Sequence, residues 1–435
     1  MLSEWTQTTL EALSRSVSYG YTESASSDPI GPHFLRITDI QNGVVDWSSV
    51  PYCPISGKNH QKYKLKGGDI VVARTGNSTG ENYFFAGDHD AVFASYLIRF
   101  SIDETLALPK FVWYTMRSPN WWAFVNQSKT GSAQAGANAK ILGRFPIDLP
   151  PLSEQSRIAH ILGSLDDKIE LNRRMNATLI GMAQALFKSW FVDFAPVLDN
   201  ALAAGNPIPD VLAARAEVRR QALANGTADR EAAKSFPDAF LETEEFGWIP
   251  AGWNIHKMSD VADLTWGDTQ VTKKSYTAEG YTAYSAKGPD GFLSYYDFDK
   301  VGIVLSAIGS NSGQSFLAHG KWSCIKNTIR LWANDSDDTS FYLYHVVSAP
   351  SFWPLRGSAQ PFISQSDARN CRCLVPEREI TREFGSMVAD LYRKTWDNES
   401  QNVTLCKLRD ILLPKLITGE LSIADAEQLS QSPTA

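Results

Sequence analysis

Two glycine-rich loops carry the side chains of this sequence that are best suited to binding a ligand. Residues 74–80 and 306–313 each follow an apolar run, and both contain a Gly-x-x-x-Gly turn. Exposed backbone N–H groups in such turns suit phosphate oxygens, while Arg and Asn can bond the edges of guanine and adenine. The candidate binding residues in these loops are Arg74, Thr75, Asn77, Ser78, Thr79, Ser306, Ser310, Asn311, Ser312 and Gln314.

Two loops of small polar residues could extend the same surface. Residues 129–140 contain Gly-Ser-Ala-Gln at 131–134, and residues 356–365 contain the same tetrapeptide at 357–360. Taken one at a time, all four loops are explained better as ordinary hairpin turns, and Gly-Ser-Ala-Gln could equally dock a domain on a helix. Their recurrence in the same order favours a binding surface. The candidates here are Lys129, Gln134, Asn138, Lys140, Arg356, Ser358, Gln360 and Gln365.

The motifs of the enzymes that act on nucleic acids are incomplete in this sequence. A methyltransferase needs an Asn/Asp-Pro-Pro-aromatic tetrad, and Asn-Pro-Ile-Pro at 206–209 and Leu-Pro-Pro-Leu at 149–152 both fail. The carboxylates at 238–244 lack the Lys that would accompany them in a metal-dependent nuclease. There is no GxxxxGK[ST] phosphate loop, and the seven His are scattered. We therefore expect no catalysis, no metal and no cofactor in this chain.

The elements that would position the loops occur twice. Trp253 corresponds to Trp5, Trp353 corresponds to Trp122, and each glycine-rich loop follows a similar apolar strand. The second Gly-Ser-Ala-Gln lies 226 residues after the first (357 − 131), and a long helical run recurs at the same offset, at 152–191 and 379–417. Trp121, Trp122, Phe352 and Trp353 are expected in the cores, in preference to serving as platforms for base stacking. The sequence therefore indicates an internal repeat.

Each helical run carries a coiled-coil seam whose steps alternate between four and three residues. Asn172 and Asn176 of the first seam correspond to Asn398 and Asn402 of the second. A seam Asn costs stability but fixes register and partner orientation, so we expect the two helices to pair; the alternative is two unrelated amphipathic helices with surface Asn. The seam residues are Ile158, Leu162, Leu165, Ile169, Asn172, Asn176, Leu179, Phe384, Val388, Leu391, Asn398, Asn402, Leu405 and Leu412.

The second helix departs from the ideal seam in three places. Thr395 and Arg409 occupy seam positions, and Pro414 lies near the end. Because Pro removes a helical hydrogen bond, we expect the helix to kink or stop near Leu413.

The expected fold is α+β, with two mixed β-rich globular domains joined by two long antiparallel helices in a pseudo-two-fold repeat. Such helices would hold the domains several tens of ångströms apart, at about 1.5 Å per residue. The segment between them is rich in charge and Pro and is expected at the surface. The expected boundaries are 1–151 for the first domain, 152–194 for the first helix, 195–246 for the connection, 247–376 for the second domain, 377–418 for the second helix and 419–435 for the tail.

Composition agrees with a globular, cytoplasmic protein. The chain is 43% hydrophobic and 20% charged, and neither a signal peptide nor a membrane-spanning run is visible. Its net charge of −7 argues mildly against nucleic-acid binding, although net charge says nothing of distribution. The odd number and scatter of the cysteines, with no CxxC pair, indicate reduced thiols: Cys53, Cys324, Cys371, Cys373 and Cys406.

Over nearly its whole length the chain resembles the specificity subunits of type I restriction–modification systems. The resemblance rests on Gly-Ser-Ala-Gln before the first helix and on Leu-Pro-Pro-Leu-Ser-Glu-Gln at 149–155, which leads into it. It also rests on Glu-Phe-Gly-Trp-Ile-Pro-Ala-Gly-Trp at 245–253 and on Leu-Leu-Pro-Lys-Leu-Ile-Thr-Gly-Glu-Leu at 412–421.

The resemblance implies that each globular domain is a target recognition domain reading half of a bipartite DNA sequence, with the helices setting the gap. It also implies two methyltransferase subunits that use S-adenosylmethionine, and restriction subunits driven by ATP with Mg²⁺. The second Gly-Ser-Ala-Gln is followed by Pro-Phe-Ile and the first by Ala-Gly-Ala, so two different half-sites are expected. The alternative is a coiled-coil scaffold whose globular domains bind proteins.

Overall fold

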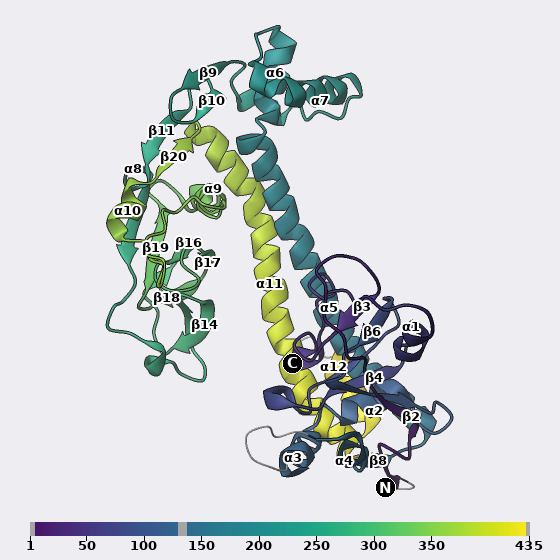
Figure 1. The fold of residues 1–435 in the computed structure, drawn as a ribbon. Coiled ribbons are helices and arrows are strands. Elements are labelled where there is room, and N and C mark those ends of the chain that lie inside the picture. Colours follow the sequence, from purple (N-terminus) through teal and green to yellow (C-terminus); the bar gives the residue numbers. More distant parts are fainter. Residues whose placement is uncertain (1–4, 129–136, 432–435) are drawn as a thin grey trace. The chain divides into compact units, whose positions relative to one another are not determined.

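The fold is described from a computed structural model, which places residues 5–128 and 137–431. The chain divides into two compact units. Unit 1 comprises residues 1–172 and 399–435, and unit 2 comprises residues 173–398. Two long helices, α5 (Leu152–Phe187) and α11 (Arg378–Ile417), each contribute residues to both units (Figure 1). Within the described residues, no helix combines the length and the hydrophobicity needed to cross a bilayer.

Unit 1 contains a β-rich domain, the first globular domain, built on a four-stranded sheet of order β2-β7-β4-β5. Strand β4 lies inside this sheet and all five of its residues are buried. The strands are β1 (Thr6–Thr9), β2 (Ser14–Tyr19), β3 (His33–Leu35), β4 (Asp69–Ala73), β5 (Asn82–Phe84), β6 (Ala91–Phe93), β7 (Leu97–Ile102) and β8 (Pro146–Leu149). The shorter helices are α1 (Gly57–Tyr63), α2 (Pro109–Thr115), α3 (Pro119–Ser128), α4 (Ala139–Gly143) and α12 (Ile423–Gln431).

Unit 2 contains the second globular domain, on a sheet of order β12-β19-β16-β17 with β16 fully buried. Its strands are β9 (Phe240–Thr243), β10 (Gly247–Pro250), β11 (Asn254–Lys257), β12 (Ala262–Trp266), β13 (Tyr281–Ser285), β14 (Gly288–Leu293), β15 (Phe298–Asp299), β16 (Gly302–Ser306), β17 (Ser315–Ala318), β18 (Lys321–Cys324), β19 (Thr328–Ala333) and β20 (Arg372–Val375). Its shorter helices are α6 (Ala195–Ala204), α7 (Ala213–Ala224), α8 (Met258–Val261), α9 (Asp337–Val347) and α10 (Gln365–Asn370).

The two four-stranded sheets have the same topology. Both are antiparallel, and β7 and β19 pair with their neighbours in matching register, with Ile98 opposite Tyr19 and Ile329 opposite Trp266. The pair β1–β8 corresponds to β11–β20, and the parallel pair β3–β6 corresponds to β13–β18. Only the second domain adds β14 and β15 to that last pair. The repeat seen in the sequence is therefore a repeat of topology.

The long helices pack antiparallel in each unit. In unit 1 Asn172 donates from Nδ2 to Gln401 Oε1 at 2.8 Å and to Asn402 Oδ1 at 2.9 Å. In unit 2 Asn398 Nδ2 donates to Asn176 Oδ1 at 2.8 Å. As the residue number increases along α5, the number of its partner on α11 decreases, which is the pattern of antiparallel helices. Around these amides Ile158, Leu162, Leu165, Ile169, Phe384, Val388 and Leu412 are buried, while Leu179, Leu391 and Leu405 are half-buried.

The two irregular seam residues of α11 have defined roles. The Thr395 carbonyl accepts a hydrogen bond from Asn176 Nδ2 at 3.1 Å, and Arg409 Nη1 donates to Asp166 Oδ1 at 2.9 Å. Arg409 therefore adds a polar contact between the helices through its side chain. The contact at Thr395 uses the backbone carbonyl, while the Thr395 hydroxyl donates within α11 to Tyr392 O at 2.7 Å.

Helix α11 does not stop at Leu413, and that part of the sequence prediction is wrong. It passes through Pro414 and ends at Ile417. Leu412, Leu413, Leu416 and Ile417 are buried in the core of unit 1, and burying each such side chain is worth about 1.5–3 kcal/mol. This burial offsets the single helical hydrogen bond that Pro414 removes.

The connecting segment is also less superficial than its charge suggested. Helix α7 is largely exposed, as expected, with Ala216 its one buried residue. Helix α6, in contrast, buries Val197, Leu198 and Ala201, and Phe236 packs in the core of unit 2. The small and apolar residues of α6 allow this burial despite the neighbouring prolines.

In each unit a polar contact joins a short helix of the globular domain to a long helix. In unit 1 the Tyr114 hydroxyl of α2 donates to Asp166 Oδ2 of α5 at 2.8 Å. In unit 2 His345 Nε2 of α9 and the Tyr392 hydroxyl of α11 share a hydrogen bond of 3.1 Å. Figure 1 shows α9 between its sheet and α11. The residue types differ, but each contact fixes a domain on its own helix.

Replacing single seam amides should cost stability, whereas replacing both partners should not. Asn398→Leu leaves Asn176 Oδ1 buried without its donor, which costs about 1–3 kcal/mol. Adding Asn176→Leu removes both polar groups and should restore most of that loss while loosening the register. The measurement is urea unfolding of the three variants. Val403→Leu, at a position 56% exposed, is the control and should change stability by less than about 0.5 kcal/mol. Equal losses in the single and double variants would contradict this pairing.

The buried imidazole of His345 should make unit 2 sensitive to acid. Burial lowers the pKa of His345 to about 4 from an ordinary value of 6.5. The unfolded chain therefore takes up a proton that the folded chain resists, so stability is complete above pH 6.5 and falls as pH drops towards 4. His345→Gln should flatten the dependence of Tm on pH across this window. His256→Gln, at an exposed position on β11, is the control. An unchanged slope in the His345 variant would rule out this group as the cause.

Candidate nucleic-acid interface

The two predicted loops of the first domain meet in the structure. Gly80 N donates to Ala73 O at 2.9 Å and closes the glycine-rich loop at the end of β4. Ala137 N donates to Arg74 O at 3.0 Å, which joins the last described part of the small-polar loop to the start of the glycine-rich loop. Lys129 and Gln134 lie outside the described residues.

The second domain repeats this arrangement with the same backbone hydrogen bonds. Gly313 N donates to Ser306 O at 3.0 Å, and Ile363 N donates to Ala307 O at 2.8 Å. Gly309 N also donates to Pro361 O at 3.0 Å. Gly80 and Gly313 both have positive φ, at 98° and 95°, a conformation that Gly adopts without strain. Each domain therefore presents one composite surface made of both loops.

Most candidate side chains of the glycine-rich loops reach solvent. Asn77, Ser310 and Gln314 are exposed, whereas Arg74, Thr75, Ser78, Asn311 and Ser312 are half-buried. Thr79 and Ser306 are fully buried, and the Thr79 hydroxyl donates to Gly76 O at 2.8 Å. Contrary to the prediction that they contact a ligand, neither side chain faces solvent. Thr79 lies in the turn that closes its loop, and Ser306 lies at the buried end of β16. We remove both from the set of candidate contacts.

In the small-polar loops several candidates already have partners. Asn138 caps α4 by accepting from Ile141 N, and Gln365 Nε2 donates to Leu264 O. Arg356 forms an ion pair with Asp367; the Ser364 hydroxyl, together with this guanidinium, holds the pKa of the Asp367 carboxyl below its ordinary value. Lys140, Ser358 and Gln360 are exposed. These capping and paired side chains help to fix the shape of the loops, in addition to any contact that they make with a ligand.

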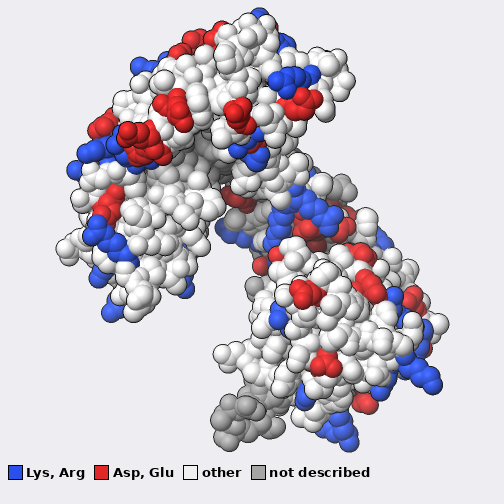
Figure 2. Space-filling model, turned by 45° about the horizontal axis from the view of Figure 1, so that its top comes forward, with Lys and Arg blue, Asp and Glu red and all other residues white. Residues whose placement is uncertain are grey.

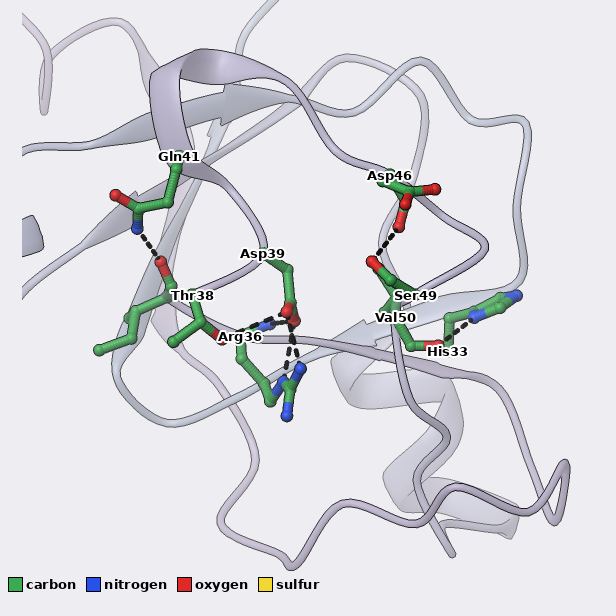
Figure 3. Close-up of polar contacts among 9 residues, drawn as sticks. His33, Arg36, Thr38, Asp39, Gln41, Asp46, Ser49 and Val50 are labelled. Atoms are coloured by element: carbon green, nitrogen blue, oxygen red, sulfur yellow. Dashed lines mark hydrogen bonds and ion pairs between the residues drawn. The ribbon is translucent and has the colours of Figure 1, made fainter. Parts of the chain in front are cut away.

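A segment of the first domain between β3 and α1 lies beside the glycine-rich loop. Its shape is fixed by its own polar contacts, among them the Arg36–Asp39 fork with Nη2 to Oδ1 at 2.8 Å (Figure 3). Gln41 donates to the Ile37 carbonyl in this segment and also to Ser78 Oγ at 3.3 Å. The segment therefore supports Ser78, which the sequence placed among the candidate contacts.

Exposed aromatic side chains that contact cations are not marked by any motif in the sequence. Tyr19 and Tyr96 flank Arg74 in the first domain, with its guanidinium carbon 5.1 and 5.8 Å from their ring centroids. In the second domain Lys321 lies 4.7 Å from the Tyr296 centroid and 5.7 Å from that of Tyr281. Cation–aromatic contacts join residues far apart in the chain, so no local motif could reveal them. In contrast, Trp121 and Trp353 are buried in the cores, as expected, while Trp122 and Phe352 are half-buried and pack against them.

The charge on the surface is mixed. On the face shown in Figure 2, Lys and Arg are interspersed with Asp and Glu, and broad areas carry neither. This face offers no continuous basic track for a phosphate backbone, in keeping with the net charge of −7. Binding of DNA through this face would need cations from elsewhere.

Groups suited to metal or thiol chemistry are not gathered in the part of the chain that the structure describes. No cluster of three or more His, Cys, Asp or Glu could hold a metal ion there. The pKa of Cys53 is raised to about 11 and that of Cys324 to about 12 by burial, so both thiols stay protonated near neutral pH.

Known proteins are similar to this chain in sequence and in fold. A profile of the type I restriction modification DNA specificity domain matches residues 32–179. The specificity subunit of the type I restriction enzyme HindI from Haemophilus influenzae is 25% identical over 472 aligned residues, covering 97% of this chain and 100% of the relative. The chain belongs to the family of type I restriction–modification specificity subunits. It is the non-catalytic DNA specificity subunit of such a system.

Other members agree with this assignment. The MjaIX specificity subunit of Methanocaldococcus jannaschii is 22% identical and aligns with 73% of this chain and 70% of its own length. The crystal structure of the type I S subunit from M. genitalium has the same fold, with a TM-score of 0.56 and 16% identity over 95% of this chain and 96% of that one. The fold of β-rich domains and two paired long helices is thus that of the specificity subunits.

Proposed function

We propose that the two globular domains each read one half of an asymmetric, bipartite DNA sequence. Residues 1–151 and 247–376 are the two target recognition domains, and the helical segments 152–194 and 377–418 set the gap between the half-sites. The observation that carries this proposal is the loop pair present in both domains. A backbone hydrogen bond joins the two loops at the equivalent place in each domain, Ala137 N to Arg74 O and Ile363 N to Ala307 O.

The side chains on these two frames differ. Arg74 of the first domain is replaced by Ala307 in the second, and Asn77 by Ser310. An equal backbone with unequal side chains is what two readers of different sequences require, because base edges are distinguished by side-chain donors and acceptors. Asn172 and Asn398, with their partners, would keep the helices in one register and so keep one gap length.

The proposed partners follow from the family. Two methyltransferase subunits would bind the long helices and methylate adenine with S-adenosylmethionine, and ATP-driven, Mg²⁺-dependent restriction subunits would join them in the cytoplasm. The charge of this chain supports shared DNA binding. With a net charge of −7, the specificity subunit needs the cations of its partners to neutralise phosphates.

The alternative function is that of a coiled-coil scaffold whose globular domains bind proteins. Mapping of methylated adenines separates the two. The chain is co-expressed with its methyltransferase subunits, and the adenines that become methylated are located across the host genome. The proposal predicts one gapped motif with two unlike halves. Methylation without a gapped motif, with all subunits shown to be present, would exclude it.

Substitutions in one loop should change one half of the motif. Replacing Arg74 and Asn77 with Ala removes side-chain donors from the first domain, so discrimination at the first half-site should fall, by about 1–3 kcal/mol for each base that these donors read. Replacing Ser310 and Asn311 with Ala is the matched change in the second domain and should affect only the other half-site. Both are measured by the same methylation mapping. Equal relaxation of both halves by either variant would refute the assignment of one domain to each half-site.

A further inference from the structure

The Arg74 guanidinium in the first domain is held by three groups from other parts of that domain. Its Nε donates to Ser95 O at 3.0 Å. Its carbon Cζ lies 5.1 Å from the Tyr19 ring centroid and 5.8 Å from that of Tyr96. Arg74 N also donates to Tyr96 O at 3.0 Å, which ties the loop to the turn before β7. We call Tyr19, Arg74 and Tyr96 the tyrosine–arginine cluster.

The tyrosines of this cluster are exposed yet fixed in place. Tyr19 is 43% exposed and Tyr96 is 55% exposed, so both rings reach solvent beside the charged group. The Tyr19 hydroxyl accepts a hydrogen bond from Ala139 N at 3.1 Å, so it also contacts the start of α4. The cluster therefore joins the glycine-rich loop, the β6–β7 turn and the end of the small-polar loop into one surface.

Within residues 5–128 and 137–431, the charge of Arg74 is not paired with an opposite charge. Arg36, Arg99 and Arg356 each form an ion pair with an aspartate. Among the described residues Arg74 pairs with no carboxylate, and its Nη1 and Nη2 have no hydrogen-bond partner. With Nε fixed by Ser95 O, the two terminal nitrogens form a planar fork of donors with a defined direction.

Such a fork matches one base edge better than any other. Guanine presents O6 and N7 as adjacent acceptors in the major groove, and bidentate bonding by Arg is the commonest specific contact to a base. The two rings reduce the conformational freedom that Arg74 would otherwise lose on binding, and they favour the cation where water is displaced.

The second domain lacks this device at the equivalent place. Ala307 N donates to Asn327 O at 3.0 Å just as Arg74 N donates to Tyr96 O, so Ala307 stands for Arg74 and Asn327 for Tyr96. Trp266 opposite Ile329 takes the place of Tyr19 opposite Ile98. No guanidinium is present at this position.

We propose that the tyrosine–arginine cluster reads a guanine through Arg74 in the half-site of the first domain, and that the second domain reads its half-site without an equivalent contact. This inference rests on the proposed function, and it names the base class that one loop recognises. Arg74 contacts the base, while Tyr19 and Tyr96 position the Arg74 guanidinium.

The test uses the complete methyltransferase complex and a library of DNA duplexes with both half-sites randomised. Methylated molecules are sequenced for the wild-type chain and for Arg74→Ala, Arg74→Lys, Tyr96→Ala and Tyr96→Phe. Lys keeps the positive charge but cannot form the planar fork. Both Arg74 variants should lose about 5- to 150-fold of the selectivity at one G·C pair of the first half-site, with the second half-site unchanged. Tyr96→Ala should lose part of that selectivity, and Tyr96→Phe, which retains the ring, should keep it. Far-UV circular dichroism and retained second-half selectivity confirm that the variants are folded.

The other outcomes are distinct. If Arg74→Lys keeps the motif while Arg74→Ala weakens binding uniformly and lowers its salt dependence, Arg74 contacts phosphate and the inference is wrong. A motif unchanged in both Arg74 variants also overturns it. If the wild-type complex selects no gapped motif at all, the proposed function itself fails, and the inference fails with it.

Discussion

The antiparallel packing of α5 against α11 is the constraint on which the rest of the structure depends. In both units a stretch of α5 meets a stretch of α11 through a largely apolar seam that contains an Asn pair, Asn172 with Asn402 in one unit and Asn176 with Asn398 in the other. A slip of one helix past its partner would leave these buried amides without partners, at about 1–3 kcal/mol each. The seam thus specifies a register as well as an association, and a fixed register is what a spacer of defined length requires.

Each globular domain contacts a long helix of its own unit through a polar pair, and the residue types of the two pairs differ. Tyr114 and Asp166 bond in unit 1, and His345 and Tyr392 bond in unit 2. Beyond these attachments the sheets have one topology, and the loops at the ends of β4 and β16 have one pattern of backbone hydrogen bonds. The scaffold is therefore repeated closely, while the side chains on it are free to differ. Under the proposed function, a chain of this design changes the DNA sequence that it recognises without changing how its globular domains are held.

Much of this architecture could be predicted from the sequence because the repeat preserves spacing. The asparagines of the two seams stand 226 residues apart, and the glycine-rich loops follow similar buried strands. Burial of Trp121 and Trp353 also followed from residue type. What could not be predicted depends on contacts between distant positions. Nothing local indicates that His345 takes the place of Tyr114, or that Tyr19 and Tyr96 flank Arg74. The burial of Thr79 likewise depends on how its loop closes, and the course of α11 through Pro414 depends on the core around Leu416.

The central claim is that two independent readers are held at one gap by the paired helices. The most direct measurement is methylation mapping with a hybrid chain, in which residues 247–376 are replaced by the corresponding domain of the HindI specificity subunit. The account predicts that the second half of the methylated motif changes while the first half and the gap remain those of the parent chain. A change in both halves, or a new gap length with the helices intact, would contradict it.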